Sequence, residues 1–194
     1  MSRRLGSGGR ASIDWRLPVV GGVLAIGLVV LLMVLLFGGG GSPVVGVGTQ
    51  QVDDGRGHIA EGTAGGPYHS VPATSGKHWP TPADWGIYSN PVPQERFLHN
   101  LEHGGIVIVY QPAKVSASDL QALTTYVQQQ VTTERFKVIL TPWGGANFGH
   151  SVAVVGWQWL LYLDSADTDG IRAFVDAHYG KAPEPFGGPG RPGG

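Results

Sequence analysis

The hydrophobic residues of the chain follow two different patterns along its length. Residues 19–37 form an unbroken run of apolar and glycine residues without any charge. From about residue 94 onward, short apolar stretches alternate with polar ones. Because a helix rises about 1.5 Å per residue, the long run reaches across the roughly 30 Å hydrocarbon core of a bilayer. It therefore predicts one transmembrane helix over residues 19–37.

Basic residues on the two sides of this run predict its orientation. Four arginines precede the run, opposed by Asp14, whereas the next basic residue after it is Arg56. The positive-inside rule makes residues 1–18 a short cytoplasmic N-terminus and places the chain after residue 37 outside the cytoplasm. A cleaved signal peptide is the alternative, but its apolar core usually spans about 7–15 residues and ends at a small-x-small motif. We therefore predict a single-pass protein of the cell membrane, held by a signal-anchor helix, with an extracytoplasmic C-terminal domain.

The rest of the chain divides by composition. Residues 38–54 read as a flexible linker, and residues 55–93 are rich in glycine, proline, histidine and aromatic residues, as loops are. Residues 183–194 spell PEPFGGPGRPGG, which predicts a disordered tail. One extracytoplasmic domain is therefore expected over residues 55–182.

Between residues 94 and 182 the pattern predicts alternating strands and helices. The β-branched run Ile106–Tyr110 is typical of a buried strand. Ser118 begins an SDLQ capping box, and an apolar stripe at helical spacing follows it. Residues 94–103 fit either a short helix or an extended segment. The remaining predicted elements are a strand over residues 136–140, one or two strands within residues 151–163, and a helix that begins near Asp167.

This order of elements indicates the α+β class. We expect a small antiparallel or mixed sheet with helices packed on one face, and a ferredoxin-like arrangement is one form that it can take. The loop-rich segment would lie over one end of the sheet, and the transmembrane helix would precede both.

Composition and charge narrow the function classes. The formal net charge is −1, and the part after residue 37 keeps nine basic and thirteen acidic residues, a formal charge of −4. This acidic balance offers no basic surface for nucleic acid. The chain has no cysteine, which excludes disulfides, thiolate metal sites and thiol nucleophiles. A metal site would have to be built from histidine and carboxylate ligands.

Histidines supply the strongest chemical signal. His99 and His103 are four residues apart, so they share a face if the segment is helical and also if it is extended. Glu102 lies between them, and His78 in the loop-rich segment is the natural third ligand. These four residues fit a site for copper or zinc, because imidazole suits both metals. A hydrogen-bonded histidine–glutamate network that fastens the loop to the sheet is the alternative.

The same stretch, HNLEH over residues 99–103, also matches H-x-x-E-H, a pattern of zinc peptidases in which the glutamate is the general base. Two glycines and a strand follow at once, and acidic residues downstream are few. A metal-dependent hydrolase is therefore kept as a further hypothesis, after metal binding and the structural network.

Aromatic residues surround the histidines in sequence. They fit a small satellite core beneath a long loop, or a stacking surface for an envelope glycan. His58 and His69 flank the first of them and could join the histidine cluster. The aromatic residues are Tyr68, Trp79, Trp85 and Tyr88.

The runs GHIAEGT, TSGKHWPTPADWGIY and HNLEHGGIVIVY, which begin at residues 57, 74 and 99, resemble a family of domains of unknown function, the one numbered 3105. Its members are often bacterial and tethered by an N-terminal transmembrane helix, which agrees with the anchor predicted above. The chain departs from the family pattern at Ala73 and Lys77, where prolines are common. The family implies no established activity, but it supports treating the histidines as one unit.

Three hypotheses follow for the extracytoplasmic domain. The first is a copper or zinc site made by His78, His99, His103 and Glu102. The second is a non-catalytic module that binds an envelope protein or glycan and uses the same residues as a structural network. The third is the metal-dependent hydrolase. Whether the chain is an enzyme, and its oligomeric state, are left open.

Overall fold

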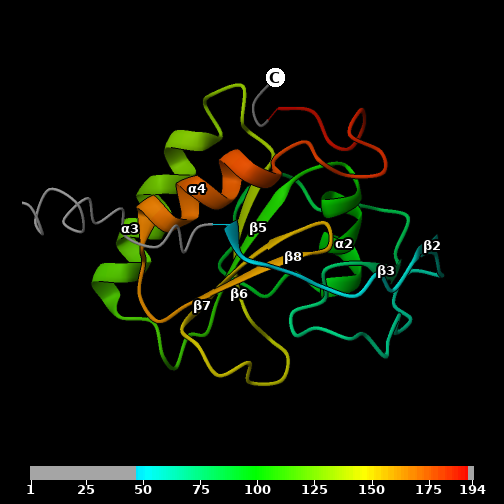
Figure 1. Cartoon of the computed structure of the whole chain (residues 1–194), viewed down its shortest axis with the longest axis horizontal. Helices are drawn as coiled ribbons and strands as arrows, with labels where there is room; N and C mark the ends of the chain where they lie inside the picture. Colours follow the sequence, from blue (N-terminus) through cyan, green and yellow to red (C-terminus); the bar gives the residue numbers. More distant parts are fainter. Residues whose placement is uncertain (1–46, 192–194) are drawn as a thin grey trace, which may run out of the picture. The chain divides into compact units, whose positions relative to one another are not determined.

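A six-stranded mixed sheet forms the centre of the described part of the chain (Figure 1). The computed structural model describes residues 47–191. The predicted cytoplasmic N-terminus and transmembrane helix lie outside these residues, so both stay predictions. Within residues 47–191, every helix is too short or too polar to span a bilayer.

The sheet is built around a strand that is buried along its whole length. This strand, β5 (Ile106–Tyr110), pairs in parallel with β6 (Val138–Pro142) and antiparallel with β7 (Val152–Gly156). Strand β8 (Trp159–Leu163) continues the sheet beyond β7. The full order is β1-β8-β7-β5-β6-β4, with β1 (Thr49–Gln50) and β4 (Gly86–Ile87) at the two edges. A strand with all five residues buried requires cover on both faces.

Helices provide this cover from opposite sides, which corrects the expectation that they pack on one face. Helices α3 (Ala117–Gln130) and α4 (Thr168–His178) pack on the face of β5 that carries Ile106 and Ile108. Helix α2 (Gln94–Glu102) packs on the other face. The reason lies in α2, whose buried residues Phe97, Leu98 and Leu101 form an apolar stripe of their own at helical spacing.

The α+β class is confirmed, but the connections differ from the ferredoxin-like form. In that form another strand separates two strands that are joined by a helix. Here β5 and β6 are joined by α3 and pair directly, from Ile106 opposite Val138 to Tyr110 opposite Pro142. Over residues 47–191, the observed architecture is a mixed sheet of six strands with three helices.

The ends of the helices follow capping chemistry, with one correction. Ser116, and not Ser118, is the N-cap of α3, because its hydroxyl accepts a hydrogen bond from the backbone N–H of Asp119 at 3.0 Å. Asp167, near which a helix was expected to begin, is the N-cap of α4 and accepts a hydrogen bond from the N–H of Gly170. Helix α2 ends at Glu102 with Gly104 in a left-handed conformation, as its place after the helix indicates.

The loop-rich segment has little regular structure, and hydrogen bonds hold it to α2. Its two short strands, β2 (Arg56–His58) and β3 (Gly76–His78), pair in parallel. The buried side chain of Asn100 in α2 bonds both backbone groups of Ala83, accepting from its N–H at 2.8 Å and donating to its carbonyl at 2.7 Å. These bonds bring a segment distant in sequence against the last turn of α2.

Replacing Phe174 by alanine tests the core beneath α4. Phe174 is 0% exposed, so we expect Phe174→Ala to lower the free energy of unfolding by about 3–5 kcal/mol through lost burial and the cavity that it leaves. Phe186→Ala is the matched control, because Phe186 is 98% exposed and its loss is expected to change stability by less than about 0.5 kcal/mol. Denaturant unfolding of both variants is the measurement, and equal effects would contradict the described packing.

Candidate metal site

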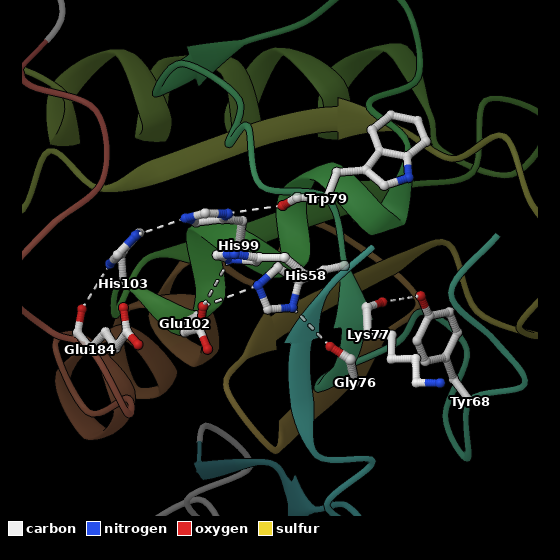
Figure 2. Close-up of polar contacts among 10 residues, drawn as sticks. His58, Tyr68, Gly76, Lys77, Trp79, His99, Glu102, His103 and Glu184 are labelled. Carbon is white, nitrogen blue, oxygen red and sulfur yellow. Dashed lines mark hydrogen bonds and ion pairs between the residues drawn. The ribbon is translucent and has the colours of Figure 1, made fainter. Parts of the chain in front are cut away.

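Three histidines from separate segments converge at the end of α2 (Figure 2). His58, His78 and His99 each offer a nitrogen, and these atoms all lie within 4.8 Å of one another. The pairing of β2 with β3 sets His58 directly opposite His78, which brings these two rings together. His99 comes from α2, and its ring stacks on that of His58 with 4.9 Å between centroids. Together they form a three-histidine group that could hold a metal ion.

Backbone carbonyls fix the orientation of the buried rings. The Nδ1 atom of His78 lies 2.8 Å from the carbonyl oxygen of Gly76, and that of His99 lies 2.9 Å from the carbonyl oxygen of Trp79. His103, the residue after the last turn of α2, places its Nδ1 2.9 Å from the carbonyl oxygen of Glu184. A carbonyl can only accept, so Nδ1 carries the proton in all three rings. In the neutral rings, the Nε2 atoms are therefore the ones with a free lone pair.

These lone pairs point at one another and at a carboxylate. The Nε2 atoms of His99 and His103 are 2.9 Å apart, and Nε2 of His78 is 3.0 Å from Oε2 of Glu102. His58 Nε2 lies 4.0 Å from the same oxygen. With Nδ1 protonated, each short contact sets one electron-rich atom against another. A proton shared by the two atoms relieves such a contact, and so does a metal ion that takes up the lone pair of one of them.

Burial makes this requirement stringent. His78 is 0% exposed and Glu102, His99 and His103 are also buried, whereas the side chain of His58 is 53% exposed. Burial, more than the neighbouring imidazoles, holds the pKa of His99 below its ordinary value and so favours its neutral form. The neutral form is the one that binds a metal. His58 is the side of the group that faces solvent.

The residues expected from sequence lie together, with one addition. His78, His99, Glu102 and His103 all belong to the cluster, and His103 joins it through His99. His58 is the addition: it belongs to the three-histidine group, whereas from sequence it was a possible neighbour of the cluster. The parallel register of β2 and β3 places His58 in the group, and no local spacing in the sequence predicts that pairing.

The four aromatic residues of the loop-rich segment each donate a hydrogen bond to a backbone carbonyl. Trp79 Nε1 donates to Thr63, and Trp85 Nε1 donates to Pro189. The hydroxyls of Tyr68 and Tyr88 donate to Lys77 and Asp84. Trp85 is buried, and the two tyrosines pack against the core on the α2 face of the sheet. These contacts favour the satellite-core interpretation, and a ligand-binding role stays a prediction.

The other three histidines lie apart from the cluster. His69 contacts Asp54 and His150 contacts Asp164, both with exposed histidine side chains. His178 on α4 is buried, and its Nε2 donates to the carbonyl of Val47 at 2.6 Å. Burial lowers the pKa of His178 from its ordinary value. Its role is structural.

The geometry gives limited support to the hydrolase pattern. Helix α2 ends at Glu102, and the carboxylate of Glu102 is directed to His78. Two described cavities lie side by side around Gln94, Glu95 and Trp143, and a third lies between α3 and α4. None of these three is lined by a residue of the histidine group.

The chain belongs to the family of proteins of unknown function DUF3105, whose sequence model matches residues 62–189. This range confirms the resemblance in the TSGKHW and HNLEHG runs. It contains His78, His99, Glu102 and His103, while His58 lies just before it. No curated protein and no solved structure matched the chain.

His178 predicts a pH dependence of stability. Its pKa is lowered in the folded state, so the unfolded chain, with the ordinary value near 6.5, binds the proton more readily. The stability that neutral His178 contributes is therefore complete above pH 6.5 and is lost as the pH falls through the folded pKa. Denaturant unfolding of the parent and of His178→Gln, a neutral donor to Val47, should show the parent losing stability relative to the variant below pH 6.5. A constant difference from pH 8 to pH 5 would contradict this role.

Proposed function

We propose that this DUF3105 protein binds one transition-metal ion, zinc or copper, through His58, His78 and His99. Glu102 is the adjacent carboxylate, and His103 is a further imidazole reached through His99. The proposal concerns metal binding and leaves open whether the bound metal serves catalysis, electron transfer or metal handling.

One observation carries the proposal. The rings of two ligands, His78 and His99, and of the neighbouring His103 are oriented by carbonyls at Nδ1, with their Nε2 atoms directed against each other or against a carboxylate. Histidines that bind metals typically donate their second ring N–H to a carbonyl or carboxylate, which fixes the tautomer and the orientation of the ring. The short contacts between Nε2 of His99 and His103, and between His78 and Glu102, mark where positive charge is needed.

The donor set favours a transition metal. Magnesium and calcium prefer oxygen ligands, whereas imidazole suits zinc and copper. Zinc in a tetrahedral site has nitrogen bonds of about 2.0–2.1 Å, which sets ligand atoms about 3.4 Å apart. The nitrogens of the group span up to 4.8 Å, so a modest closing of the rings completes such a site. Nothing in the ligands selects between the two metals.

The alternative to metal binding is that protons occupy these contacts. One proton shared by His99 and His103, and one between His78 and Glu102, would relieve both contacts and leave a structural network. A proton shared by His99 and His103 makes an imidazolium in a buried place, and burial, which lowers the pKa of His99, opposes that charge. A metal ion bound at His78 and His99 takes up the lone pair of each ring while both imidazoles stay neutral.

Metal content of the purified full chain is the test. We expect about one zinc or copper ion per chain after exposure to either metal and removal of excess, because three imidazoles converge. His99→Gln should weaken binding by at least about a hundredfold, since it removes a ligand atom and not merely an orienting partner. Elemental analysis and competition titration with a chelating dye are the measurements.

His150→Gln is the matched control, because His150 is also paired with a carboxylate but lies outside the cluster. It should bind metal as the parent does. Equal metal content in His99→Gln and the parent would show that metal binds elsewhere. Absence of metal from the parent, together with lower stability of His99→Gln, would establish the proton-linked network instead.

We also propose, from the arginines that precede residue 19, that the domain is displayed outside the cytoplasm on the helix predicted over residues 19–37. Sealed, right-side-out membrane vesicles test this proposal. Added protease should remove a C-terminal epitope from intact vesicles. Protection of the epitope until detergent is added would place the domain in the cytoplasm.

A further inference from the structure

A segment near the C-terminus covers one side of the histidine cluster. This strap, residues 184–189, follows α4 and returns to the last turn of α2. The backbone N–H of Glu184 donates to the carbonyl of Glu102 at 3.0 Å. The carbonyl of Glu184 accepts from Nδ1 of His103, as Figure 2 shows. The strap thus supplies the acceptor that orients one of the cluster's own rings.

Close packing reinforces these two bonds. A Cβ atom placed on Gly187 would lie 2.7 Å from Cε1 of His103, and one on Gly188 would lie 3.2 Å from its Cβ. The strap backbone therefore lies directly on the imidazole, at a distance that a larger residue at either position would obstruct. At the far end, Nε1 of Trp85 donates to the carbonyl of Pro189 at 2.9 Å.

Lys137 fastens the strap to the end of α2. Its ammonium donates to the carbonyls of His103 at 3.0 Å, Pro185 at 3.0 Å and Gly187 at 3.1 Å. All three ammonium protons are therefore used, one on the helix end and two on the strap. Burial lowers the pKa of Lys137 from its ordinary value. A partly buried cation whose three protons are all donated to carbonyls is a specific anchor.

We propose that Lys137 is a positioning residue of the metal site, which holds the strap against His103 so that strap docking and metal binding are coupled. This inference rests on the proposed function. The docked strap orients His103 through the carbonyl of Glu184, and Nε2 of His103 lies 2.9 Å from Nε2 of the ligand His99. Linkage is reciprocal, so a docked strap raises metal affinity and a bound metal holds the strap in place.

Two readouts on the full chain test the coupling. Lys137→Met keeps the length of the side chain and removes its charge and its three bonds. It should weaken zinc binding by about tenfold, the scale for losing an orienting partner of a ligand. Chymotrypsin reports on the strap itself. Phe186 is 98% exposed and so can be recognised, and cleavage of the bond after it requires the strap backbone to leave its docked position. Zinc should slow this cleavage in the parent and have little effect in Lys137→Met.

Arg191→Ala is the matched control. Arg191 follows the strap and pairs with the exposed Glu134, so its loss should change neither zinc affinity nor the zinc effect on cleavage. A chain that ends at Pro183 provides a second variant without any change in the sheet, and it should show the same tenfold loss of zinc affinity. Circular dichroism checks that both altered chains are folded.

The outcomes separate the two proposals. If the parent binds zinc and both Lys137→Met and the shortened chain bind it equally well, the coupling is refuted while the metal site stands. If the parent binds neither zinc nor copper, the metal site fails and the coupling fails with it. Weaker binding in both variants, with parent-like binding in Arg191→Ala, establishes the strap as part of the site.

Discussion

The hydrogen bonds from Nδ1 to backbone carbonyls are the interaction on which the candidate site depends. Each buried imidazole must have a partner for its N–H, and the chain provides one from Gly76, Trp79 and Glu184 in turn. These three carbonyls belong to β3, to the residue after it and to the C-terminal strap. The same bonds that orient the rings therefore join the loop-rich segment and the C-terminal region to α2. The orientation of the rings and the tertiary structure therefore depend on the same hydrogen bonds.

Much of the regular structure could be predicted from periodicity, because its elements are continuous in sequence. The strand Ile106–Tyr110 and the start of α4 at Asp167 occur where the pattern indicates them. The arrangement of helices could not, since the continuous apolar run of β5 does not say which helix covers which face. The edge strands could not either. Strands such as β2 are two or three residues long and exist through pairing with distant segments.

The candidate site shows the same division. Spacing on a helix groups His99 with His103, and this geometry is local enough to infer from sequence. His58 and His78 are paired by the register of two strands separated by a long loop. Glu184 meets His103 across 81 positions in sequence, from a segment whose composition is typical of disorder. What the pattern misses in each case is a contact that only the folded backbone creates.

The single carboxylate of the cluster constrains its chemistry further. Metal binding requires deprotonated ligands, so a site of imidazoles beside this one carboxylate would carry one negative charge among buried side chains. A divalent ion there leaves one positive charge uncompensated, which is costly to bury without a further anion or water. A further anion or water can reach the cluster at His58, because the side chain of His58 is half exposed to solvent. The opposite side is closed by His103 and the strap. An exogenous ligand of a bound metal would therefore approach past His58, whereas the strap side serves to hold the protein ligands in place.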